Sequence, residues 1–242
     1  MSRNPFLSFG FRNFIADLAW LGAVQTAGAR RLTRADFDRL SVQIRTVVNF
    51  DPRFKVPYLL GGLILGESRD HVLEAVRILQ LGMENHPSDW RFPFYQAFIQ
   101  YFSLGDPQEA GISMEAASRI PGSPPYLPLL ASRMLVEGRN PDTALALLSG
   151  MLDQETDPAR EQILRKRILD VTAERDLQML ERAVVEYQRK TGSAPADLAD
   201  LVRAGVVRAI PPEPHGGRYL LSPDGAVRSS EMHGRLKVFR SR

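Results

Sequence analysis

Residues 70–101 read DHVLEAVRILQLGMENHPSDWRFPFYQAFIQY and contain the second helix of one predicted hairpin and the first helix of the next. The first of these two helices places a small, a large apolar and a second small residue before a proline, at offsets of four, seven and twelve residues: Ala75, Leu79, Gly82 and Pro87. Small side chains allow a neighbouring helix to approach closely. A proline stops the helix because it lacks an N–H and clashes with the preceding turn. The stretch therefore predicts that one helical hairpin ends at Pro87 and another begins.

The same spacing recurs along the chain. Offsets of four, seven and twelve are repeated by Leu40, Ile44, Val47 and Pro52, and offsets of four and seven by Ala110, Met114 and Ala117 and by Ala144, Leu148 and Met151. Proline and glycine cluster between these segments and mark the turns. The pattern predicts four helical hairpins, at about 11–52, 54–87, 88–121 and 126–158.

Local signals refine the first two hairpins. A first helix over residues 11–29 is indicated by large apolar residues at helical spacing: Phe14, Leu18, Leu21 and Val24. Thr33 is placed to cap the second helix, and Asp36 in its first turn is favoured by the helix dipole. The adjacent Gly61 and Gly62 weaken a helix by roughly 1 kcal/mol each relative to alanine. We therefore predict that they mark a close contact between helices.

The chain after the fourth hairpin is predicted to be a degenerate repeat or the cap of the array of hairpins. Residues 159–190 are rich in Glu, Arg, Leu and Ala and predict helix throughout. Two apolar stripes in this segment are out of step across Glu174 and Arg175, so that either one helix drifts or two helices meet there. The many charges of the segment fit the polar outer face that a terminal repeat needs.

The pattern becomes extended after residue 191. A short helix is predicted over 195–203, followed by a hairpin of residues 218–221 and 226–229 around a Ser-Pro-Asp-Gly turn. Residues 236–239 are a candidate third strand. We expect this small tail to pack against the last helix before it.

Residues 11–152 resemble tetratricopeptide repeats (TPR) in the spacing of their second helices, although the Trp-Leu-Gly-Tyr pattern of the first helices is mostly missing. The resemblance implies a right-handed superhelix whose concave face holds a peptide or a partner protein, and it implies no catalysis. We therefore expect a mainly α fold. It would comprise a TPR-like solenoid of antiparallel helical hairpins over 1–190 and a small α+β appendage with a β-hairpin over 191–242.

The tail contains a tyrosine that ends a helix, a short helix with a leucine-valine pair, and proline-rich residues that lead through glycine to a hairpin with a second tyrosine. The relevant positions are Tyr187, Gly192, Pro195, Leu198, Leu201, Pro211, Pro212, Pro214, Gly216, Gly217 and Tyr219. This pattern resembles the region after the long helix of type II secretion major pseudopilins. The N-terminal pilin anchor and the aspartate-rich calcium loop of that family are not evident, so neither filament assembly nor calcium binding is implied. The opening FGFRNFIADLAWLGAVQ also resembles the segment after a membrane anchor in some bacterial envelope repeat proteins.

Composition limits the chemistry. The 242 residues are 44% hydrophobic, enough for a sizeable core, and the absence of cysteine excludes disulfides, thiolate metal sites and a cysteine nucleophile. Charge is uneven: about +4 over residues 1–34, about +5 over 203–242 and roughly −6 between them. No apolar run spans a bilayer and no signal peptide is evident. We expect a cytoplasmic protein, or an envelope or periplasmic one if an anchor precedes this sequence.

No set of residues predicts catalysis, a cofactor or a metal. His71 and His86 form no HxxxH pair, and His215 and His233 with neighbouring acids are a weak candidate for a metal site, less favoured than ordinary surface residues. We expect no enzyme and no cofactor. The alternative function is a nucleic-acid-binding or regulatory protein that uses the basic termini, but the sequence contains no reader motif and we expect no nucleic-acid partner.

The densest aromatic cluster lies in residues 90–102. We predict that Phe94, Phe98 and Tyr101 form a core face, while binding surfaces are enriched in Tyr and Arg. The predicted partner-binding groove comprises Tyr58, Arg91, Tyr95 and Tyr101. The predicted function is a non-catalytic scaffold or adaptor that holds another protein or a peptide segment, such as a component of an envelope, secretion or pilus assembly.

Overall fold

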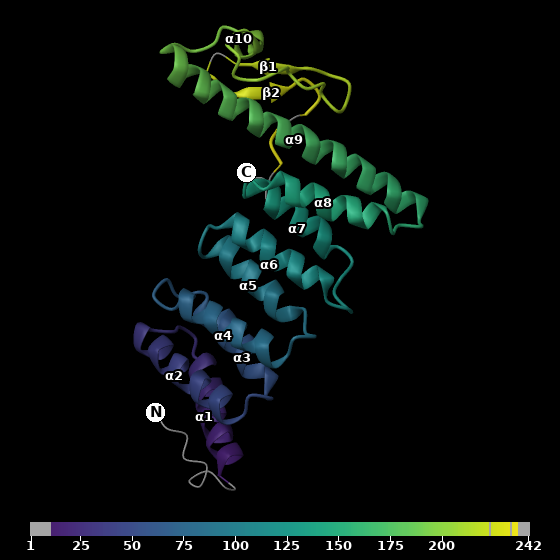
Figure 1. The fold of residues 1–242 in the computed structure, drawn as a ribbon. Helices are drawn as coiled ribbons and strands as arrows, with labels where there is room; N and C mark the ends of the chain where they lie inside the picture. Colours follow the sequence, from purple (N-terminus) through teal and green to yellow (C-terminus); the bar gives the residue numbers. More distant parts are fainter. Residues whose placement is uncertain (1–10, 223, 233, 237–242) are drawn as a thin grey trace. The chain divides into compact units, whose positions relative to one another are not determined.

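Ten helices and one two-stranded hairpin make up the chain in the computed structural model, which describes residues 11–222, 224–232 and 234–236 (Figure 1). The chain divides into two compact units, Met1–Leu127 and Pro128–Arg242. The first unit contains α1 (Arg12–Ala27), α2 (Arg34–Phe50), α3 (Lys55–Leu65), α4 (Val72–Asn85), α5 (Arg91–Phe102) and α6 (Pro107–Arg119). From Leu127 onward follow α7 (Leu127–Glu137), α8 (Pro141–Leu152), α9 (Pro158–Thr191), α10 (Leu198–Arg203), β1 (Tyr219–Leu221) and β2 (Val227–Ser229).

Antiparallel helix pairs build the first unit. α1 packs on α2, α3 on α4 and α5 on α6, and α3 also contacts α5, in a repeat-like helical architecture (Figure 1). The predicted cap is confirmed, because the Asp36 N–H donates to Thr33 Oγ1 at 3.3 Å and the Thr33 N–H donates to Asp36 Oδ2 at 2.9 Å. This reciprocal capping box satisfies two N–H groups at the start of α2.

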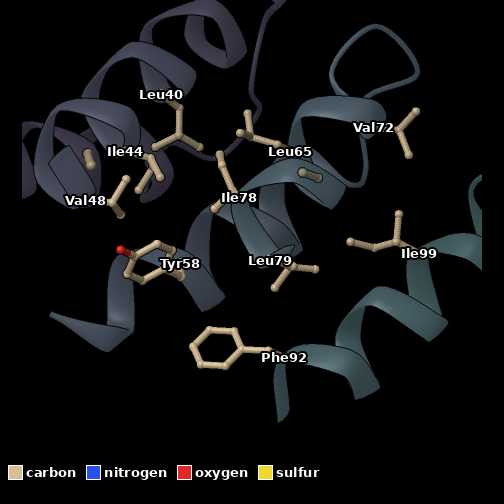
Figure 2. Packing of buried hydrophobic residues seen from close by; sticks show 12 residues of the cluster. Leu40, Ile44, Val48, Tyr58, Leu65, Val72, Ile78, Leu79, Phe92 and Ile99 are labelled. Carbon is tan, nitrogen blue, oxygen red and sulfur yellow. The ribbon is translucent and has the colours of Figure 1, made fainter. Parts of the chain in front are cut away.

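The core of the first unit lies between α2, α3, α4 and α5 (Figure 2). It contains Leu40, Ile44, Val48, Tyr58, Leu65, Ile78, Leu79, Phe92 and Ile99. Gly61 and Gly62 lie on the two sides of α3 that enter this core. A Cβ atom on Gly61 would stand 2.7 Å from Ile44, and one on Gly62 would stand 2.6 Å from Leu79. The prediction that the two glycines mark close helix contacts is confirmed.

The second unit is organised around one long helix. α9 runs without a break for 34 residues, which resolves the alternative left by the two apolar stripes in favour of a single helix. Its end is sharp because Gly192 adopts a left-handed conformation with φ 78° and its N–H donates to the Gln188 carbonyl. α9 shares a core with α7 and α8 that contains Leu135, Val136, Ala144, Leu148, Leu164 and Val171.

The tail packs on the other half of α9, as predicted. β1 and β2 pair antiparallel with Tyr219 opposite Ser229 and Leu221 opposite Val227. Their inward residues and those of α10 cover the C-terminal half of α9 in a cluster that contains Leu177, Leu180, Val184, Leu198, Leu201, Tyr219 and Val227. The third strand predicted at 236–239 falls almost wholly outside the described residues. Because the tail shares this cluster with α9, the tail and α9 belong to one compact unit.

None of the helices in the described part of the chain combines the length and the apolar character that crossing a membrane requires.

Candidate partner-binding surface

Tyr58, the first residue of the predicted groove, lies in the core. Its side chain is 1% exposed and lies near Phe92 (Figure 2). The Tyr58 ring meets the rings of His86 and Phe92 edge-on, with centroids 5.8 and 6.1 Å apart. Its hydroxyl donates to the Pro52 carbonyl at 3.2 Å, and burial raises the pKa of the phenol. A side chain enclosed in this way packs α3 against its neighbours and is not available to a partner.

Arg91 is committed to an ion pair. Its Nε and Nη2 donate to the two carboxylate oxygens of Asp89 at 2.8 and 2.6 Å, and Lys55 Nζ lies 2.9 Å from Asp89 Oδ2. The carboxylate is 8% exposed. The Arg91 hydrogen bonds hold the pKa of Asp89 well below its usual range against the opposing effect of burial, and Lys55 adds to the shift. The Arg91 guanidinium is nevertheless half exposed and forms a polar edge beside the start of α5.

Tyr95 and Tyr101 are both partly buried and lie on α5. Tyr95 packs against the core of the first unit, and its ring lies 5.3 Å from that of Phe94. The Tyr101 ring lies 4.9 Å from that of Phe102. Three of the four predicted groove residues, Arg91, Tyr95 and Tyr101, thus lie on one helix.

A row of aromatic rings follows α5 at four-residue spacing, and we call it the α5 aromatic row: Trp90, Phe94, Phe98 and Phe102. The rings of Trp90 and Phe94 are 5.7 Å apart, and those of Phe98 and Phe102 are 4.5 Å apart. The last two side chains are 46% and 50% exposed. The prediction that Phe98 belongs to the core was therefore wrong. α5 fills the core instead with Phe92 and Ile99, and this orientation turns Phe98 outward.

The neighbouring helix α3 adds to the exposed apolar surface of this unit. Val56 and Leu63 are seven residues apart, so they lie on one face of α3, and both are exposed. Leu104, directly after α5, is exposed as well. Helices α3 and α5 contact each other, and contiguous exposed apolar side chains are typical of surfaces that bind proteins. The sequence signal for this surface was the spacing of positions 90, 94, 98 and 102.

The buried ionisable groups of the second unit serve its fold. The Glu213 carboxylate accepts hydrogen bonds from the N–H groups of His215 and Gly217 at 2.7 and 3.1 Å and from the Ser229 hydroxyl at 3.0 Å. Burial favours its protonated form, but these hydrogen bonds outweigh burial and lower its pKa. They join the loop before β1 to β2, and such a carboxylate is a structural acceptor.

The candidate metal ligands are only partly described. His215 Nε2 lies 3.1 Å from Asp170 Oδ1, whereas His233 lies outside the described residues. In the part of the chain that the structure describes, no group of three or more histidine and acidic side chains is arranged to hold a metal ion.

Comparison of the chain with protein-family models, with curated proteins and with solved structures found no match.

Proposed function

We propose that this chain is a non-catalytic scaffold or adaptor of the TPR-like type, which docks an apolar segment of a partner protein on the α5 aromatic row. The observation that carries the proposal is the exposure of Phe98 and Phe102, whose rings contact each other on the surface of a packed helix pair. Aromatic side chains provide large contact areas at low entropic cost and dominate the energetics of protein interfaces.

The ion pair at the start of α5 is a second argument for docking on the α5 aromatic row. Asp89 holds Arg91 and Lys55 in place, so that a polar edge lies beside the aromatic row. A polar rim around an apolar centre is the common organisation of protein interfaces. The recurring helix pairs add support, because repeat architectures present extended binding surfaces.

We place the scaffold in a bacterial envelope, secretion or pilus assembly. The support for this part is the resemblance of the tail to pseudopilins, carried by residues such as Pro214, Gly217 and Tyr219.

Site-specific photo-crosslinking in the native cell tests the docking surface. A photoreactive amino acid at Phe98 is compared with one at Leu73, an α4 residue that is 62% exposed and lies outside the aromatic row. We expect discrete crosslinked products from position 98 and none of the same mass from position 73. The variant Phe102→Ser should weaken the crosslink at position 98. Identical products from the two positions would refute the α5 docking surface.

A further inference from the structure

Helix α1 differs from an ordinary surface helix, because it buries small side chains and exposes several large apolar ones. The side chains that it buries are small: Ala16, Ala23 and Thr26. Four large apolar side chains of α1 and that of the preceding Phe11 are 46–64% exposed, whereas Trp20 packs against the core. These five exposed residues make up what we call the α1 face: Phe11, Phe14, Leu18, Leu21 and Val24. Positions 14, 18 and 21 are four and three residues apart and therefore follow one side of the helix. The sequence pattern located this helix correctly, but the apolar stripe points away from the unit to which the helix belongs.

The packing of α1 on α2 fixes this orientation. A Cβ atom on Gly22 would stand 2.6 Å from the Gln43 side chain of α2. Thr26 Oγ1 donates to the Gly22 carbonyl at 2.9 Å and lies 3.1 Å from Gln43 Oε1. The α1 residues that are fully buried are accordingly small, and Trp20, alone among the described large apolar residues of α1, is packed against the core of the unit. Rotation of α1 to bury Leu18 would require its separation from α2.

Arginines lie near both ends of α1. Residues 11–34 contain four arginines, at 12, 30, 31 and 34, and one acidic residue, Asp17. Arg12, Arg30 and Arg31 are exposed, and within the described residues none of these three has a carboxylate oxygen within 4 Å. The hollow beside the C-terminal end of α1 is lined by Arg30 and Arg31 together with Phe37, Ile64 and Glu67.

We propose that the α1 face docks on the surface of a lipid bilayer that contains anionic lipids. Large apolar side chains along one side of a helix, with basic residues near its ends, suit binding of the helix parallel to an anionic membrane surface. The helix would lie in the interface and not cross the membrane, because its 16 residues are about 24 Å long and include Asp17.

A second copy of the chain fits this surface less well. Two α1 helices would meet along a single contact only about 24 Å long. A contact of that length buries less area than the roughly 1,200 Å² that stable interfaces bury. An antiparallel pairing centred on Leu18 would also bring the two copies of Asp17 close together. The excess of arginine over acidic residues likewise favours an anionic surface over another copy of the same cationic helix.

Vesicle flotation of the full chain tests the proposal. Vesicles of phosphatidylcholine with about 30 mol % phosphatidylglycerol are compared with pure phosphatidylcholine, each at low salt and at about 0.5 M salt, where surface charge is screened. We expect binding to the anionic vesicles that weakens in high salt. The double variant Leu18→Gln with Leu21→Gln should bind at least about tenfold more weakly, because two large apolar side chains are lost from the membrane contact.

Matched variants separate the apolar contribution to vesicle binding from the electrostatic contribution. Leu73→Gln with Leu81→Gln removes two exposed leucines from α4 and should bind vesicles like the wild type. Arg30→Gln with Arg31→Gln should abolish the preference for anionic vesicles. Circular dichroism melting checks that each variant is folded, which is expected because all six substituted side chains are outside the core.

Three outcomes would overturn the proposal. The first is failure of the wild-type chain to bind anionic vesicles, and the second is binding by the Leu18 and Leu21 double variant that equals binding by the wild type. The third is a monomer–dimer equilibrium in light scattering that the double variant abolishes, together with an absence of vesicle binding. The last outcome would assign the α1 face to a second copy. None of these results bears on crosslinking at Phe98, so this inference and the proposed function fail independently.

Discussion

Gly62 of α3 lies directly against Leu79 of α4, so that a Cβ atom on Gly62 would stand 2.6 Å from both Cγ and Cδ2 of the leucine. Leu79 is fully buried in the core cluster that also contains Phe92 and Ile99 of α5 (Figure 2). The close approach of the two helices therefore depends on the missing side chain at position 62.

Substitution Gly62→Ala should destabilise the first unit. Overpacking of a filled core costs about 1–3 kcal/mol, and the higher helix propensity of alanine offsets at most about 1 kcal/mol of this. We expect a net loss of about 1–2 kcal/mol in denaturant unfolding. The control is Gly150→Ala in α8, where an added Cβ meets nothing within 4 Å, and there the free energy of unfolding should rise. Equal effects of the two substitutions would contradict the steric account.

The Asp89 ion pair should make the first unit sensitive to acid. The folded-state pKa of Asp89 is depressed, chiefly by the Arg91 hydrogen bonds, below the value of about 4 in an unfolded chain. Its contribution to stability is therefore fully present above about pH 5 and declines as the pH falls through and below the unfolded pKa. Asp89→Asn should lower stability at pH 7 by about 1.5–3 kcal/mol and flatten the acid limb of the stability curve. A curve that shifts without a change in its slope below pH 5 would exclude this role.

Glu213→Gln should loosen the tail without disturbing the first unit. Both Glu213 oxygens accept hydrogen bonds, and an amide nitrogen in place of one of them would face a donor and leave it unsatisfied. A loss of about 1–3 kcal/mol is expected, seen as faster amide exchange in β1 and β2. Glu84→Gln, an exposed position on α4, is the control and should change neither quantity. Unchanged exchange in the hairpin of the Glu213 variant would be the contrary result.

Arg235 attaches the end of the described chain to α9. Its guanidinium donates to Glu174 at 2.5–3.0 Å and also pairs with Glu181, while Glu174 itself is 2% exposed. Arg235→Met leaves the buried Glu174 carboxylate without its ion-pair partner and should cost about 2–3 kcal/mol, less than for a fully buried pair because Arg235 is partly exposed. Adding Glu174→Gln should recover part of that loss. A double-mutant cycle measures the coupling, and strict additivity would show that the two side chains act independently.

Local signals in the sequence determined where the helices begin, end and approach one another. The Thr33 cap, the paired glycines at 61 and 62 and the proline at position 87 act through hydrogen bonds and steric exclusion over a few residues, so their consequences can be read from the chain directly. The positions of the helix pairs and of the tail hairpin follow from such signals.

Only the tertiary structure decided which side of each helix is buried. Tyr58 enters the core, whereas Phe98 and Leu18 point outward although their sequence periodicity is the same as that of core residues. Periodicity defines a stripe on one helix, but burial depends on what the neighbouring helices present. α1 approaches α2 closely at Gly22, where an added Cβ atom would stand 2.6 Å from Gln43. On α5, Phe92 and Ile99 fill the core, and Phe98 lies outside it. The candidate binding surfaces are therefore a result of packing between elements.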